Sequence, residues 1–131
     1  MRKVPQVILA VLLLMVFGQA YYAQAHLELL GEANVDGEAD HDKIKVGRAD
    51  GKFRAIQIKV ERAPVDFQKV VIHYGSGADE EIEIRNRINA GGESRLIDLR
   101  GRDRVNDSVE FWYAKAKYDS AKPKVLLYGL P

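Results

Sequence analysis

The sequence predicts an all-β fold, a two-sheet antiparallel β-sandwich of about eight strands with jelly-roll-like connections, behind an N-terminal signal peptide. From residue 27 onward, apolar residues recur at every second position far more often than with the period of about 3.6 residues that a helix requires. Glycine, aspartate, asparagine and proline divide the same region into short segments. The chain contains no cysteine, so a packed core rather than disulfide bonds must stabilise the domain.

Residues 1–25 have the layout of a cleaved secretory signal peptide. Arg2 and Lys3 give a positive start, residues 7–17 form an unbroken apolar run, and small residues lead to the cleavage position at Ala25. The run is shorter than the roughly 20 apolar residues of a membrane-spanning helix. We therefore expect export to the periplasm or the extracellular medium and no stable membrane span, with an uncleaved anchor as the alternative.

Cleavage after Ala25 leaves residues 26–131 as the mature chain, and cleavage after Ala20 is the alternative. A chain of about 100 residues buries roughly 60 to 70% of its unfolded surface, which is enough for one core. Residues 26–131 are therefore expected to form a single domain. Removal of the two cationic residues of the signal changes the formal charge from +1 to −1, which gives no electrostatic reason to bind nucleic acid.

The first half of the domain is predicted to contain four strands. The first runs from Leu27 toward Val35, and the second centres on Ile44 and Val46. Asp50-Gly51 follows as a hairpin turn, because both residue types tolerate positive φ. The third and fourth strands carry their apolar residues at these positions: Phe53, Ile56, Ile58 and Val60, then Val65, Phe67, Val70, Ile72 and Tyr74.

The fourth strand contains an irregularity. Its inward-facing positions shift by one residue between Phe67 and Val70, which predicts a β-bulge or a bend near Gln68. Pro64 separates this strand from the one before it, since proline cannot donate a hydrogen bond to a central ladder.

The second half is predicted to contain four more strands. Ile82 and Ile84 alternate with charged residues, which favours a strand. A short helix is the alternative, because Ile84 and Ile88 are one helical turn apart and Gly91-Gly92 would terminate a helix. The remaining strands carry their apolar residues at these positions: Ile97 and Leu99; Val109, Phe111 and Tyr113; Val125 and Leu127.

Three stretches carry a family resemblance: residues 29–31, residues 98–105, and residues 109–113 with the terminal 125–129. Here the chain resembles a domain-of-unknown-function family of short exported bacterial β-sandwich proteins. The resemblance covers most of the mature chain and rests on packing and turn residues. It implies a fold and a compartment, and it implies no activity, substrate or catalytic residue.

The sequence contains no recognisable catalytic constellation. None of its serines stands in a nucleophile-elbow context, and the neighbouring acids Glu80 and Glu81 point to opposite faces of a strand. We therefore expect a non-catalytic binding or envelope-associated module without a cofactor. Its partner would be an envelope or extracellular ligand, with carbohydrate as the candidate class.

The candidate binding residues are Trp112, Arg100, Arg102 and Arg104. Because side chains alternate along a strand, Trp112 lies on the face opposite to Phe111 and Tyr113. An exposed indole can stack on a sugar ring. An indole covered by a loop is the alternative. The arginines make one rim locally basic and suit anionic glycans or lipid headgroups, unless they pair with the acidic run at residues 79–83.

Copper binding is the second function that the sequence raises. Cleavage after Ala25 makes His26 the first residue, and its amino group and imidazole can chelate one copper ion. His41 or His73 would supply a further imidazole. Small periplasmic copper carriers are similar in beginning with histidine. The alternative is that His26 lies in a frayed terminus and the other two are ordinary surface residues.

Overall fold

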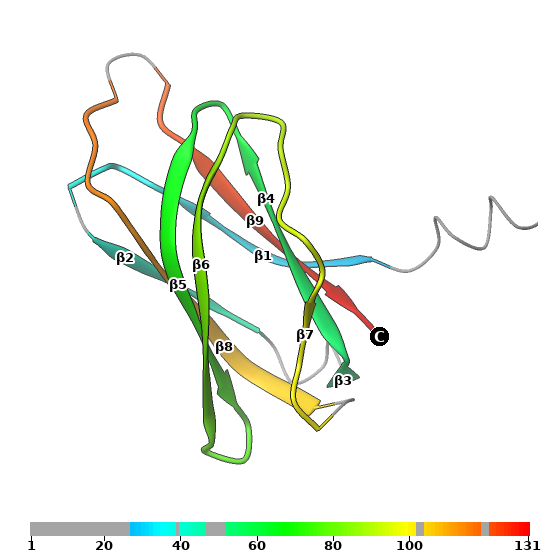
Figure 1. Cartoon of the computed structure of the whole chain (residues 1–131). Helices are drawn as coiled ribbons and strands as arrows, with labels where there is room; N and C mark the ends of the chain where they lie inside the picture. Colours follow the sequence, from blue (N-terminus) through cyan, green and yellow to red (C-terminus); the bar gives the residue numbers. More distant parts are fainter. Residues whose placement is uncertain (1–26, 39, 47–51, 102–103, 119–120) are drawn as a thin grey trace, which may run out of the picture.

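The computed structural model describes residues 27–38, 40–46, 52–101, 104–118 and 121–131, with the backbone alone at 104–106. These residues form a β-sandwich of two sheets that pack face to face (Figure 1). Its strands are β1 (Glu28–Asn34), β2 (His41–Lys45), β3 (Lys52–Phe53), β4 (Ala55–Glu61), β5 (Val65–Tyr74), β6 (Asp79–Ile88), β7 (Ile97–Asp98), β8 (Arg104–Tyr113) and β9 (Lys124–Leu130).

The strand order is that of a jelly roll. One sheet has the order β1-β9-β4-β7 and the other the order β2-β8-β5-β6, and all pairings are antiparallel. With the short strand β3 set aside, the first, last, third and sixth strands form one sheet and the second, seventh, fourth and fifth form the other. This is the order produced by two Greek keys in succession, and it confirms the predicted fold class.

The described residues contain nine strands rather than the expected eight, because the strand expected over residues 53–60 is broken at Arg54. Before the break, Phe53 in β3 pairs with β8, and after it Ala55 in β4 pairs with both β7 and β9. The chain thus passes from one sheet to the other at a single bent residue. The predicted turn at Asp50-Gly51 lies outside the described residues.

Two other expectations are confirmed. The region of Ile82 and Ile84 is the strand β6, not a helix. The predicted bulge is present, since the register of β5 shifts between Phe67 and Lys69 against both of its neighbours. A bulge adds a residue to one strand and bends it locally, and here it opens a depression at the surface.

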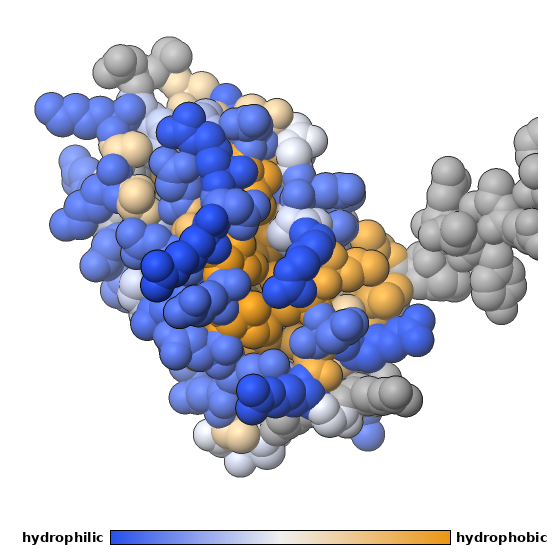
Figure 2. Space-filling model, in the orientation of Figure 1, coloured by the Kyte–Doolittle hydropathy of each residue, from blue (hydrophilic) through white to orange (hydrophobic). Residues whose placement is uncertain are grey.

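The core lies between the two sheets and is apolar. Phe53, Phe111 and Tyr113 are its largest fully buried side chains. Figure 2 shows hydrophobic residues at the opening between the edge strands β6 and β7, with hydrophilic residues on both sides.

Strand β8 places different chemistry on its two faces. Phe111 and Tyr113 point into the core, whereas Glu110 and Trp112 point to solvent and are half-buried. The Tyr113 hydroxyl donates to Asp42 at 2.5 Å, and burial followed by this carboxylate raises the pKa of the phenol. Tyr113 thereby ties β8 to β2 and fixes the end of the strand that carries Trp112.

Candidate binding face

The outer face of the β2-β8-β5-β6 sheet carries a cross-strand row of His41, Trp112 and Lys69, and we call this surface the Trp112 face. His41 is paired with Trp112 across β2 and β8, and Lys69 is paired with Trp112 across β5 and β8. The His41 and Trp112 rings stack with centroids 5.2 Å apart and an interplanar angle of 20°. From the other neighbouring strand, Lys69 Nζ lies 4.5 Å from the centroid of the Trp112 ring. The indole is therefore held between an imidazole and an ammonium group.

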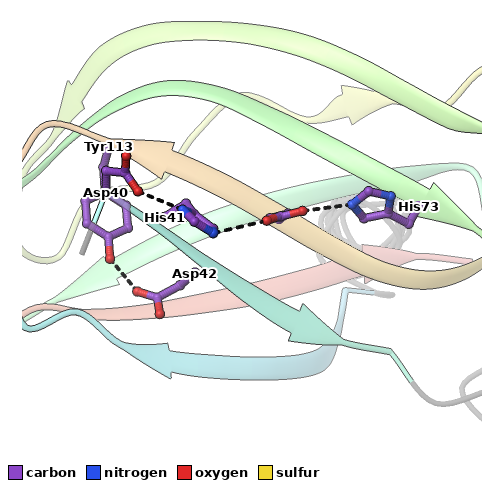
Figure 3. A network of polar contacts seen from close by, with 6 residues as sticks. Asp40, His41, Asp42, His73 and Tyr113 are labelled. Carbon is purple, nitrogen blue, oxygen red and sulfur yellow. Dashed lines mark hydrogen bonds and ion pairs between the residues drawn. The ribbon is translucent and has the colours of Figure 1, made fainter.

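A chain of polar contacts crosses the same face beside the indole. Glu110 receives one imidazole on each carboxylate oxygen: His73 Nε2 lies 2.9 Å from Oε1, and His41 Nε2 lies 3.5 Å from Oε2. The outer nitrogens are also engaged, with His41 Nδ1 2.7 Å from Asp40 Oδ1 and His73 Nδ1 2.7 Å from Asp79 Oδ1. Figure 3 shows the two rings at either end of the central carboxylate. The chain fixes the orientation of both imidazoles, including the one stacked on Trp112.

Two groups in this series of polar contacts, His73 and Asp40, have shifted pKa values. The hydrogen bond to Glu110, and after it the one to Asp79, raise the pKa of His73 above its ordinary value. At the other end, the hydrogen bond from His41 lowers the pKa of Asp40. Desolvation and Lys43 oppose the effect on His73 without reversing it. The face therefore favours the protonated form of His73.

This shift predicts that stability depends on pH. A group whose pKa is higher in the folded state stabilises the fold fully below its unfolded pKa, about 6.5 for histidine, and loses this contribution as pH rises through the folded pKa. We expect the free energy of unfolding, measured with urea, to fall as pH rises above about 6.5. Glu110→Gln should lower the pKa of His73, measured by NMR titration, and flatten the pH dependence. An unchanged His73 pKa in that variant would contradict the assignment of Glu110 as its main cause.

Two of the predicted binding residues that the structure describes, Trp112 and Arg100, lie apart. Arg100 binds Glu80, which is buried on the core side of β6: the Arg100 backbone N–H donates to Oε1 at 3.0 Å, and its Nε lies 3.8 Å from Oε2. Trp112 points from the opposite face of the same sheet. Arg102 lies outside the described residues, and Arg104 is placed in β8 without its side chain.

The acidic run at residues 79–83 contacts three cations, and one of them, Arg100, is an arginine of the predicted basic rim. Arg100 contacts Glu80, and His73 contacts Asp79. Lys69 Nζ lies 3.1 Å from a Glu81 carboxylate oxygen. This last ion pair sits on the Trp112 face and positions the ammonium group above the indole.

The histidines predicted as metal ligands are partly brought together. His41 and His73 converge on Glu110, whereas His26 lies outside the described residues. Within the described ranges, no group of three or more histidine, cysteine, aspartate or glutamate side chains is arranged to hold a metal ion. The copper chelate at His26 stays a prediction.

Sequence reasoning missed two members of the Trp112 face, namely His41 as a stacking partner and Lys69, but it placed Glu110 beside Trp112. Glu110 stands two residues before Trp112 in a strand, so alternation alone places the two on one face. The partners on β2 and β5 depend on the register between strands, which alternation within one strand does not define.

Comparisons with known proteins agree with the fold. The family model "Domain of unknown function (DUF2541)" matches residues 7–129. The structure of AlgX from Pseudomonas aeruginosa superposes with a TM-score of 0.54 at 16% sequence identity, over 79% of this chain and 27% of that one. The present chain thus spans about a quarter of the length of AlgX, and at this identity the likeness concerns the fold alone. No curated protein matches the sequence.

The part of the chain that the structure describes includes no helix with the length and apolar character needed to cross a membrane.

Proposed function

The chain belongs to the domain-of-unknown-function family DUF2541, and we propose that it is an exported, non-catalytic binding module that holds a carbohydrate of the cell envelope or extracellular medium on its Trp112 face. Export is proposed from the signal-peptide layout of residues 1–25. The observation that carries the binding proposal is the half-buried indole of Trp112, held in place among hydrogen-bonding groups on the outer face of a sheet.

Carbohydrates fit this combination of groups. A sugar ring presents C–H bonds that pack on an aromatic face and hydroxyl groups that need donors and acceptors at its edge. Sites for such ligands combine an apolar or aromatic surface with a few well-placed polar groups. The Trp112 face offers the indole together with Glu110 and two imidazoles whose orientation is already fixed. Preorganised groups lose little entropy on binding, which favours affinity.

Lys69 covers one face of the indole, and a ligand that stacks there must displace it. Its side chain is more than a third exposed and is held by an ion pair with Glu81, also exposed. Exposed ion pairs contribute about 0 to 1 kcal/mol, and an exposed cation–π contact about 0.5 to 1 kcal/mol. Because these interaction energies are small, the ammonium group can move aside while His41 stays stacked on the opposite face of the indole.

Trp112→Ala tests the proposal, with Tyr128→Ala as a matched control. Tyr128 is also half-buried and carries a lysine over its ring, Lys59 Nζ at 4.7 Å, but it lies on the outer face of the other sheet. In affinity electrophoresis through gels containing neutral or acidic polysaccharides, we expect Trp112→Ala to weaken retention at least about tenfold, roughly 1.4 kcal/mol. Tyr128→Ala should bind as the wild type does.

The proposal is wrong if no polysaccharide retards the wild-type protein, or if the two variants lose retention equally. Circular dichroism spectra that match the wild type would show that both variants are folded.

A further inference from the structure

Three depressions adjoin one another from the bulge of β5 to one end of the sandwich. The first has a volume of about 570 Å³, opens at Gln68, and includes Lys69 of the Trp112 face. The second, of about 380 Å³, shares Asp66 and Arg87 with the first. The third, of about 740 Å³, shares Lys117 and Tyr118 with the second. Shared lining residues place the three depressions in a row, which we call the groove, and its first member lies beside the Trp112 face.

The far end of the groove is rich in cations that have no partner of their own. The third depression is lined by Lys115, Lys117 and Lys122, which we call the lysine cluster, and all three are exposed. Among the described residues, none of the three takes part in a hydrogen bond or an ion pair. The acids of this depression are Asp36 and Glu38, and a carboxylate oxygen of Asp36 accepts the backbone N–H of Glu38 at 2.9 Å.

Cations in the rest of the groove are paired, which sets the lysine cluster apart. Arg87 holds Asp66 with two hydrogen bonds, Nε to Oδ1 at 2.8 Å and Nη2 to Oδ2 at 3.2 Å. This contact lowers the pKa of Asp66, and it fixes the wall between the first and second depressions. Arg85 lies 3.7 Å from Glu83. The groove therefore changes along its length from cations held in ion pairs to three exposed lysines that lie near two acids without an ion pair to them.

Tyr118 forms the boundary between the second and third depressions. Its hydroxyl donates to the Pro64 carbonyl at 3.1 Å, and its ring is half-buried. Burial raises the pKa of the phenol, so it stays a neutral donor. The groove thus has an aromatic side chain at each end of its first two depressions, Trp112 beside Lys69 and Tyr118 beside Lys117.

We infer that the ligand is an anionic sugar polymer, which runs from the Trp112 face along this groove and places its acidic groups at the lysine cluster. The inference rests on the proposed function and adds the ligand's charge and its direction. A polymer fits because the row of three depressions extends beyond one sugar ring, and negative charge fits because lysines outside ion pairs attract anions without first breaking an ion pair. The expected ligand is a sugar chain that bears carboxylate or sulfate groups.

The test compares two triple variants that remove the same charge. Lys115→Ala/Lys117→Ala/Lys122→Ala removes the cluster, and the control replaces Lys52, Lys59 and Lys124, which do not line the groove, by alanine. Titration calorimetry uses two pairs of probes: polygalacturonate with its methyl ester, and dextran sulfate with dextran. We expect the wild type to bind at least one anionic probe about tenfold or more tightly than its neutral counterpart.

The first triple variant should lose this difference and the control should keep it, and added salt should weaken only binding of the anionic probe. The pair of probes that shows the preference identifies carboxylate or sulfate as the recognised group. Equal affinity for charged and neutral probes, or equal losses in the two triple variants, would overturn the inference.

The two proposals fail in different ways. If Trp112→Ala abolishes binding to every probe while the lysine variants bind normally, the Trp112 face is the site and the anionic groove is wrong. If the lysine variant loses the anionic probe while Trp112→Ala binds normally, the groove binds polyanions without the Trp112 face, and the proposed function is wrong.

Discussion

Phe111→Ala is expected to lower the free energy of unfolding by about 3 to 5 kcal/mol, the usual cost of truncating a fully buried phenylalanine. Phe111 is fully buried, and its ring packs edge-on against Phe67 at 6.1 Å and beside Tyr113 at 6.3 Å. Small domains are stable by only about 5 to 15 kcal/mol, so the loss is a large share of the total. Urea denaturation followed by circular dichroism measures it.

Comparison of Phe111→Ala with Trp112→Ala distinguishes the roles of the two faces of β8 in stability and in binding. Phe111 and Trp112 are neighbours in sequence but face the core and the solvent, respectively. Phe111→Ala should keep the wild-type affinity for carbohydrate at a temperature where it is folded, whereas Trp112→Ala should lose affinity with little loss of stability. Phe111→Leu, which keeps most of the volume, serves as the control and should cost clearly less. A loss below about 1 kcal/mol for Phe111→Ala would contradict its place in the core.

Gly37→Ala is expected to destabilise the protein by about 1 to 3 kcal/mol and to weaken binding of the anionic probe. Gly37 has a φ of 87°, and an added Cβ would lie 2.0 Å from the backbone carbonyl oxygen of Ala116. The carbonyl of Ala116 is part of the backbone and cannot rotate away from the new methyl group as a flexible side chain can. The segment that carries Lys115 and Lys117 must therefore move. Urea denaturation and calorimetry with polygalacturonate measure the two effects.

Gly77→Ala is the matched control for this prediction. Gly77 also has a positive φ, 91°, but a Cβ there would meet nothing within 4 Å. It reports the conformational strain alone and should leave ligand binding unchanged. If the two variants are equally destabilised and bind equally, the contact between Gly37 and Ala116 does not hold the groove in shape.

The sequence patterns that concern single strands were sufficient to predict them. Alternation predicted that Phe111 and Trp112 face opposite ways, and the break in alternation predicted the bulge at Gln68, because both follow from the two-residue period of a strand. The prediction of one continuous strand over residues 53–60 was wrong. The chain changes sheets at Arg54, and no glycine or proline marks this bend in the sequence.

Contacts between strands could not be predicted. Glu110 and His73 are 37 residues apart, and only the register of β5 against β8 brings them together. Gln57 alternates as an outward residue but is buried, because a segment lies along β4 beside it. The Gln57 side-chain N–H donates to the carbonyl of Ser94 in that segment. That segment binds β4 mainly through backbone groups, which leave no pattern of side chains in the sequence.

The most direct measurement of the central claim is the fluorescence of Trp112, which is the only tryptophan in the chain. Excitation at the indole reports on the Trp112 face without any label or substitution. Titration with the polysaccharide that retards the protein in gels should produce a saturable change in intensity or emission wavelength, with the same midpoint as the calorimetric binding curve. Unchanged emission at ligand concentrations where calorimetry shows saturation would contradict the account, because binding would then occur away from Trp112.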